Sequence, residues 1–163
     1  MKIPDAITPV VGYRGWSVGM GRLWSPRGPA RVPWPKRGPL RARCLKDGAP
    51  NPFHPEIKPA ERHDAPQPDC SCGVYAAREP WDIEASWVTP PWGVVWGKVH
   101  GWGRVVLGRT GWRAELVCPV ELFADPSWNA ATRYEMNAVA KTYGLPLLWE
   151  ENVTLASSDW IPA

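Results

Sequence analysis

The chain has 163 residues, of which 44% are apolar and 21% charged, so it is long enough for one domain with a hydrophobic core. Its composition is unusual in holding 12 Trp and 20 Pro but only 2 Phe. No charged leader precedes an apolar run at the N-terminus, and no segment approaches the ~18 apolar residues of a membrane helix. We therefore expect a single cytoplasmic domain over residues 1–163, without membrane contact.

Charge is divided unevenly along the chain, whose formal net charge is +3. Residues 13–62 hold 11 Lys or Arg and 3 Asp or Glu, whereas residues 63–163 hold 7 and 12. Such a division fits a basic arm that binds a polyanion, and it equally fits two halves that complement each other within one fold. Because prolines interrupt the basic residues and no helix face groups them, we favour the second interpretation.

The N-terminal quarter predicts short strands followed by extended chain. Residues 13–18 and 21–24 have the composition of two strands around a glycine-bearing turn. Residues 25–39 contain five prolines, which favours an extended loop over a helix. Residues 40–45 alternate arginine with smaller or apolar residues, so we predict a half-buried strand that carries Cys44 inward.

A second proline-rich loop is predicted over residues 46–69, where the chain offers few large apolar residues. A structureless loop of about 20 residues inside a compact domain needs a fastening. Cys44, His63, Cys70 and Cys72 could close a tetrahedral zinc site, because thiolate and imidazole are ligands that zinc prefers. Four protein ligands would make the site structural, whereas three would leave a coordination position open for catalysis.

Several alternatives to this zinc site fit the same residues. The Cys-x-Cys spacing is less typical of zinc modules than Cys-x2–4-Cys, so free thiols or a disulfide stay open. In a reducing cytosol, metal ligands or free thiols are the commoner states of clustered cysteines. His54 is an alternative to His63 as the imidazole ligand. Cys70 or Cys72 could also act as a nucleophile with His63 as its base, but no acidic residue is identifiable to orient that base.

The middle of the chain carries the strongest β signal. Residues 74–77 are expected to form a short apolar element, and residues 80–87 a helical turn or two. Glycine-bearing turns are predicted at 100–101 and 108–111. The three strands that these turns would join cover residues 93–99, 102–107 and 112–118.

One helix is predicted near the C-terminus. Asp125 is a good N-cap with Pro126 at the first helical position, and Gly144 stands just past the end. Between these signals a packing stripe recurs at helical spacing, formed by Thr132, Met136, Val139, Ala140 and Tyr143. Residues 145–149 are expected to add an edge strand, and residues 150–163 a loosely ordered tail. The predicted fold class is α+β, with a small antiparallel sheet, one main helix and a zinc-braced proline-rich loop region.

Basic and aromatic residues between positions 22 and 43 form a candidate binding arm. Arginine binds phosphates and an indole can stack on a base, which suits nucleic acid. Trp and Arg are also favoured anchors in protein–protein interfaces. Alternatively, the tryptophans cap the core and the arginines keep the arm soluble. The candidates are Trp24, Arg31, Trp34, Arg37, Arg41 and Arg43.

A candidate polar site lies on one face of the predicted strand 112–118. Arg113 and Glu115 alternate there with Trp112 and Ala114, and Arg14 is a candidate third member. A solvated strand face or an internal ion pair is the interpretation that we favour for these charges. The remaining cysteine, Cys118, is expected to be a small buried apolar residue.

Four motifs occur in a distinctive order along the chain. They are GYRGW from Gly12, CSCGVYA from Cys70, WGKV from Trp96 and GWRAE from Gly111. In sequence and order they resemble a group of small proteins from Gram-positive bacteria and their phages, whose members show Cys, then His-x-Ala-Pro, then Cys-x-Cys-Gly-Ile-Tyr-Ala. His63 begins the matching His-x-Ala-Pro segment here. The resemblance implies a phage or mobile-element origin, and it implies no particular activity.

These observations favour a non-enzymatic binding or regulatory protein that holds a structural zinc and acts through protein–protein contacts. One alternative is a nucleic-acid-binding accessory protein that uses the arm 22–43. A second is a small enzyme with a site near Arg113 and Glu115. The sequence contains no phosphate loop, dinucleotide fingerprint, nucleophile elbow or His-Glu-x-x-His motif.

Overall fold

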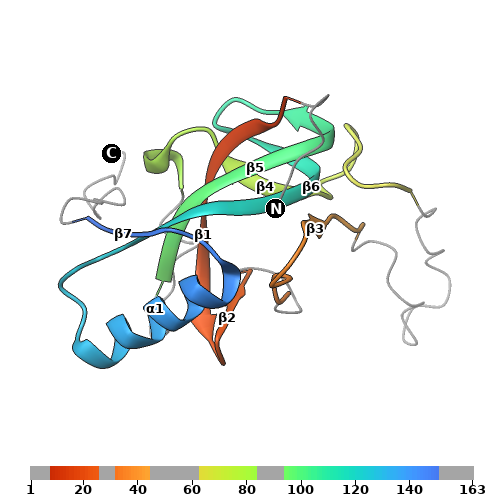
Figure 1. Cartoon of the computed structure of the whole chain (residues 1–163). Coiled ribbons are helices and arrows are strands. Elements are labelled where there is room, and N and C mark those ends of the chain that lie inside the picture. Colours follow the sequence, from red (N-terminus) through yellow and green to blue (C-terminus); the bar gives the residue numbers. More distant parts are fainter. Residues whose placement is uncertain (1–7, 26–31, 45–62, 84–93, 151–163) are drawn as a thin grey trace, which may run out of the picture.

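The computed structural model describes residues 8–25, 32–44, 63–83 and 94–150, which form a mixed β-sheet packed against an α-helix (Figure 1). The strands are β1 (Val10–Gly19), β2 (Arg22–Trp24), β3 (Leu40–Arg41), β4 (Val74–Ala77), β5 (Val94–Leu107), β6 (Gly111–Ala124) and β7 (Leu147–Trp149). The helical elements are a single 3-10 turn, η1 (Pro80–Asp82), and the helix α1 (Ala130–Tyr143). The predicted α+β class is confirmed, with the refinement that β7 runs parallel to β6 while every other pairing is antiparallel.

Four strands close the sheet on itself. Strand β1 pairs with both β5 and β4, and β6 pairs with the same two strands. The pairings therefore form a ring in the order β1, β5, β6, β4, with β2, β3 and β7 added at its margins. A closed ring leaves fewer unpaired backbone groups than an open sheet of the same strands.

Strand β5 runs without a break through His100 and Gly101, where we predicted a turn. A side chain at Gly101 would lie 2.4 Å from the ring of Trp112, so this glycine allows a neighbouring indole to lie against the strand. The strand bends instead at a register shift between Trp102 and Val105. Gly103 lies inside that bulge with φ of 79°. Two of the predicted strands are therefore one long strand.

The core lies between the curved sheet and α1, which crosses one side of it (Figure 1). Trp16 and Trp34 meet there edge to face, with ring centroids 5.3 Å apart. A smaller cluster holds Trp96 and Phe123, whose rings stack at 4.2 Å. Much of the tryptophan excess is thus used to fill cores, for which large aromatic side chains contribute the most buried area.

Helix α1 ends as predicted but begins later. Asn129 is the N-cap, and its side-chain oxygen accepts a hydrogen bond from the Thr132 amide at 3.0 Å. Gly144 follows the last turn in the left-handed conformation, with φ of 65°. The predicted stripe packs inward, with Met136, Val139 and Ala140 buried.

The residue that we predicted as the N-cap, Asp125, closes a separate turn. Its carboxylate accepts from the Ser127 amide at 2.7 Å, and its carbonyl accepts from the Trp128 amide at 3.3 Å. Hydrogen bonds from the Ser127 side chain and then from the Ser127 amide lower the pKa of Asp125. An aspartate followed by proline starts a turn as readily as a helix, because both use the same side-chain-to-amide hydrogen bond. The cap prediction was wrong for this reason.

Other predicted elements are present with changed bounds. The strand predicted over 40–45 is β3, limited to two residues, although Cys44 beyond it is buried as expected. The turn predicted at 80–87 is η1, and residues 84–87 lie outside the described residues. The loops predicted at 25–39 and 46–69 are described only at 25, 32–39 and 63–69.

The C-terminal part follows the same pattern. Strand β7 is the edge strand predicted within 145–149. Of the tail predicted over 150–163, the structure describes only its first residue. Within the described ranges, no helix combines the length and apolar character needed to cross a membrane.

The capping assignment predicts a specific loss of stability. Replacing Asn129 by alanine removes the acceptor for the Thr132 amide and should lower the free energy of unfolding by ~1 kcal/mol. The matched change Asn137→Ala, at an exposed position inside the same helix, should change it by less than ~0.5 kcal/mol. Urea denaturation followed by circular dichroism measures both. Equal losses would show that Asn129 is not the cap.

Candidate metal centre

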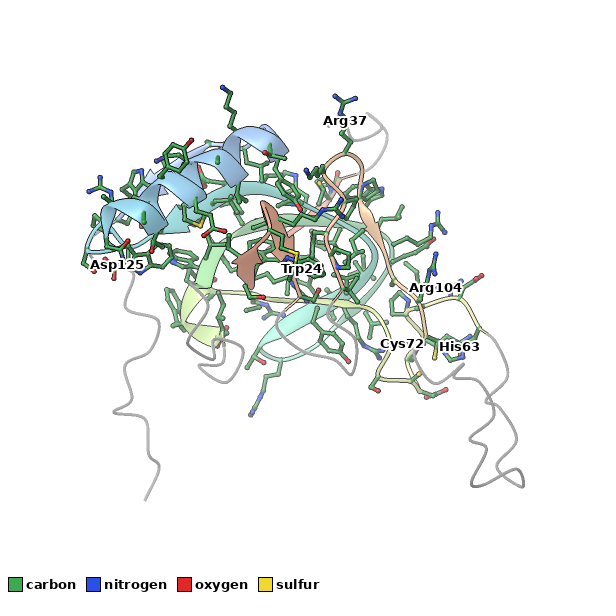
Figure 2. The ribbon with its side chains drawn as sticks, turned by 90° about the horizontal axis from the view of Figure 1, so that it is seen from below. Trp24, Arg37, His63, Cys72, Arg104 and Asp125 are labelled. Carbon is green, nitrogen blue, oxygen red and sulfur yellow. The ribbon has the colours of Figure 1, made fainter. Side chains whose placement is uncertain are left out.

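The four predicted ligands meet at one margin of the sheet. Cys44, His63, Cys70 and Cys72 each offer one ligand atom, and these atoms all lie within 4.8 Å of one another. The Cys44 and Cys70 sulfurs are 3.7 Å apart, and His63 Nε2 lies 3.2 Å from the Cys72 sulfur (Figure 2). A tetrahedral zinc with bonds to sulfur of ~2.3 Å would hold two thiolates about 3.8 Å apart. The cluster therefore has the dimensions of a zinc site.

Strand β6 brings the two ligand-bearing segments together. Its first half pairs with β4, which begins two residues after Cys72. Its middle pairs with β3 at Leu40 and Arg41, and the Ala42 amide continues this pairing to the Glu115 carbonyl at 2.7 Å. Because β5 occupies the other edge of β6, the two short strands lie end to end along the same edge. Cys44 and the Cys70–Cys72 segment meet where these strands adjoin.

Arg113 of β6 holds the segment that carries two of the ligands. Its guanidinium donates to the carbonyl of Cys70, to that of Cys72 at 2.7 Å and to that of Pro68 at 3.1 Å. Gly73 has φ of 128°, and a side chain there would lie 3.0 Å from Arg113 Cβ. The fork of arginine donors thus fixes the turn from which both sulfurs project.

One thiol of the cluster, that of Cys70, has a pKa suited to metal binding. The pKa of Cys70 is lowered to about 7, first by a hydrogen bond from the Cys72 backbone amide and then by the side chains of Cys72, Cys44 and His63. The structure contains no disulfide among its described cysteines. A thiolate is the form that binds a metal, so a lowered pKa reduces the cost of losing the proton on binding.

A cavity of about 490 Å³ opens beside the cluster. Its walls are formed by Arg41, Ala42, Arg43, Cys44, His63, Asp64, Ala65 and Glu115. Glu115 is engaged by Arg41 at 2.9 Å and by the Arg104 amide at 3.3 Å, and the Arg104 guanidinium donates to the Asp64 carbonyl at 2.9 Å. The cavity therefore has walls of both charges and reaches two of the four ligand residues.

The predicted polar site of Arg14, Arg113 and Glu115 is not assembled. Arg113 is committed to the ligand segment and Glu115 to Arg41. Arg14 is buried, where it donates to the Tyr75 carbonyl and to Ser25 Oγ, and burial lowers its pKa to about 10. The prediction rested on the alternation of charged and apolar residues along one strand. Such alternation shows which side chains share a face, but not which residues of neighbouring elements they contact. Glu115 instead forms an ion pair with Arg41, whose side chain is 67% exposed.

The predicted binding arm is also changed by the fold. Trp34 is fully buried and donates through Nε1 to Ser25 Oγ at 3.0 Å, so it cannot stack on a base. The half-buried Trp24 donates to the Gly19 carbonyl at 2.8 Å. Arg37 and Arg43 are exposed, and Figure 2 shows Arg37 well away from the labelled His63 and Cys72. Arg31 lies outside the described residues.

Arg104 is a contributor that the sequence did not identify. It lies in the β5 bulge beside Gly103, and only that bulge brings its amide to Glu115 and its side chain to the 63–65 segment. A glycine inside a strand pattern signals a bulge, but not which neighbour the next residue will reach. Figure 2 places Arg104 on the same side of the molecule as His63.

Comparison with known proteins adds no relative. No protein-family model matches the chain, and neither curated proteins nor solved structures match it. The resemblance of its motifs to small proteins of Gram-positive bacteria and phages stays a prediction.

The contacts of Arg113 predict an effect on metal affinity. Arg113→Met should weaken zinc binding about 10- to 100-fold, because the Cys70–Cys72 turn loses its three carbonyl contacts. Arg113→Lys, which keeps the charge but not the fork, should recover little of that loss. The exposed Arg109→Met is the matched control. Competition against a chromogenic chelator measures the affinities, and a wild-type value for Arg113→Met would contradict the assignment.

Proposed function

We propose that this protein is a non-enzymatic binding or regulatory protein, fastened by a structural zinc and acting through contacts with another protein. The observation that supports a zinc site is that four ligand atoms lie within 4.8 Å of one another. They come together although a long stretch of sequence separates Cys44 from the other three ligands.

The donor set favours zinc over other metals. Three thiolates and one imidazole suit a borderline-soft ion, whereas magnesium and calcium require oxygen ligands. Four protein donors complete a tetrahedron, so no position is left for substrate or activated water. A closed site of this kind has a structural role, and we assign that role here.

The metal would fasten the margin of the sheet. Cys44 follows the two-residue strand β3, whose pairing with β6 is too short to hold it firmly. Cys70 and Cys72 belong to a turn that Arg113 secures to β6. A zinc bound by both segments, with a binding free energy of ~10 kcal/mol or more, would lock β3 in place.

Protein contacts are supported by the side chains that the fold leaves outside. Trp81 of η1 is 66% exposed although tryptophan dominates the cores, and Arg37 and Arg43 are exposed as well. Exposed tryptophan and arginine are the side chains that most often anchor protein–protein interfaces. Arg113 and Glu115, the residues of the enzyme alternative, each have a structural partner.

Nucleic acid binding is the second candidate function. Lys36, Arg37 and Arg43 are exposed on one segment, and Arg41 joins them while paired with Glu115. Four cations on a short stretch suit a phosphate backbone. The burial of Trp34 removes one of the two stacking platforms that this function would use.

The origin and location of the protein are proposed from the motif resemblance alone. The ordered motifs suggest a phage or mobile-element protein that acts in the cytoplasm of a Gram-positive host. A reducing cytoplasm would keep the three clustered thiols available for zinc.

Metal content tests the first proposal. The purified protein should hold about one zinc per chain by plasma mass spectrometry, and the double change Cys70→Ser with Cys72→Ser should abolish it. Cys118→Ser is the matched control, because Cys118 is buried away from the cluster and should leave the zinc content unchanged. A metal-free native protein whose melting temperature is unaffected by the double change would refute a structural zinc.

A capture experiment separates the two kinds of partner. Immobilised protein is incubated with a Gram-positive lysate, with and without nuclease, and the retained material is compared with that on an unrelated zinc protein. Protein binding predicts a retained protein that survives nuclease and is reduced at least about tenfold by Trp81→Ala, with Tyr134→Ala as the exposed aromatic control. Nucleic acid binding predicts retention that is lost with nuclease and with Arg37→Ser plus Arg43→Ser. Retention equal to the unrelated protein would contradict both.

A further inference from the structure

The cavity beside the metal centre reaches the three sulfur ligands unequally. Cys44 lines its wall, together with His63, whereas Cys70 and Cys72 are not among the residues that line it. All three cysteines are otherwise buried, with exposed fractions of 6%, 9% and 8%. The cavity, at about 490 Å³, is far larger than the ~30 Å³ that a water molecule occupies in the liquid. The cavity therefore offers a small solute an approach to the cluster from the Cys44 side.

The partner of Cys44 is already in place. Its sulfur lies 3.7 Å from that of Cys70, and a disulfide bond of ~2.05 Å would require the two sulfurs to approach by about 1.7 Å. Rotation of two side chains can supply such a movement. The Cys72 sulfur instead has its 3.2 Å contact with His63. Arg113 holds the carbonyls of both Cys70 and Cys72, which keeps the two sulfurs in these different positions.

We propose that Cys44 and Cys70 form an oxidation site at which a hydroperoxide converts the zinc centre into a disulfide and expels the metal. This inference rests on the structural zinc proposed above. It assigns different roles to the cysteines, with Cys44 as the sulfur attacked first, Cys70 as the resolving sulfur and Cys72 as a ligand only.

The chemistry is balanced by one molecule of hydrogen peroxide. The Cys44 thiolate attacks one peroxide oxygen and the O–O bond breaks. Hydroxide departs, and Cys44 becomes a sulfenic acid. The Cys70 thiolate then attacks that sulfur, the S–S bond forms and a second hydroxide leaves. Two thiolates are oxidised by two electrons and the peroxide is reduced. His63 and Cys72 are then the two remaining zinc ligands, and two are too few to retain the ion.

The exchange would replace one fastener by another. Both zinc and the Cys44–Cys70 disulfide join the segment after β3 to the turn before β4, so the margin of the sheet stays linked. What changes is the cavity wall, because Cys44 turns toward Cys70 and His63 loses its metal. A partner that contacts this wall would therefore distinguish the two states.

The test uses the zinc-loaded wild-type protein with one equivalent of hydrogen peroxide. Zinc release is followed with a chromogenic chelator, free thiols are blocked by alkylation, and the protein is digested with trypsin. Cleavage after Arg43, Lys46, Arg62 and Arg78 gives the peptides 44–46 and 63–78. We expect these peptides joined through Cys44 and Cys70 with Cys72 alkylated, in an amount equal to the zinc released. Cys118→Ser should behave as the wild type does.

Several outcomes would overturn the assignment. The first is a disulfide between Cys70 and Cys72 within peptide 63–78. The second is zinc release while Cys44 is recovered as a free thiol that the alkylation has blocked. The third is zinc that stays bound after the peroxide is consumed. A chain that holds no zinc before oxidation would instead refute the structural zinc, so the two proposals fail separately. A Cys70→Ser variant adds a check on order, because Cys44 should then accumulate as a sulfenic acid that dimedone traps.

Discussion

The pairing of β6 with two short strands along one edge is the constraint on which the rest of this structure depends. β4 takes the first half of that edge and β3 its middle, so segments separated by a long stretch of sequence end at the same place. This pairing brings Cys44 and the Cys70–Cys72 turn to the same place, where the four candidate ligand atoms lie within 4.8 Å of one another. β6 also closes the ring through β5 and supports β7, so a change that weakened it would affect the core and the metal centre together.

Two arginines show how this fold uses charge inside. Arg113 and Arg14 each donate to backbone carbonyls beside β4, the first before the strand and the second within it. Burying a guanidinium is costly unless its donors find acceptors, and a backbone carbonyl accepts a hydrogen bond without adding an opposite charge. For Arg14 the ring of Trp34 also lies 5.3 Å from the guanidinium carbon. Arg113, a candidate for a polar site by sequence, thus holds the turn that carries two candidate metal ligands.

The agreement between sequence and structure depended on how local each signal was. Gly144 ends the helix because a left-handed residue is a local requirement, and the stripe of Met136 and Val139 follows from helical spacing alone. The turn predicted at Gly101 was wrong because a glycine is required there to make room for the ring of Trp112 on another strand. Asp125 was misjudged because one side chain suits both a turn and a cap. Of these signals, the two that fix a single local conformation were reliable. The one that suits two conformations and the one that depends on another strand were not.

The sequence by itself determined the chemistry of this protein. It specified three thiols and an imidazole as candidate metal ligands, and an α+β chain whose helix ends at a glycine, because residue type and spacing suffice to predict both. Tertiary structure decided the assignments of the charged and aromatic residues. Strand register turned Arg113 toward the ligand turn, placed Glu115 against Arg41 and buried Trp34, leaving Trp81 outside. The physical reason is that a side chain's role depends on what lies across the sheet from it, and only the closed sheet specifies that neighbour.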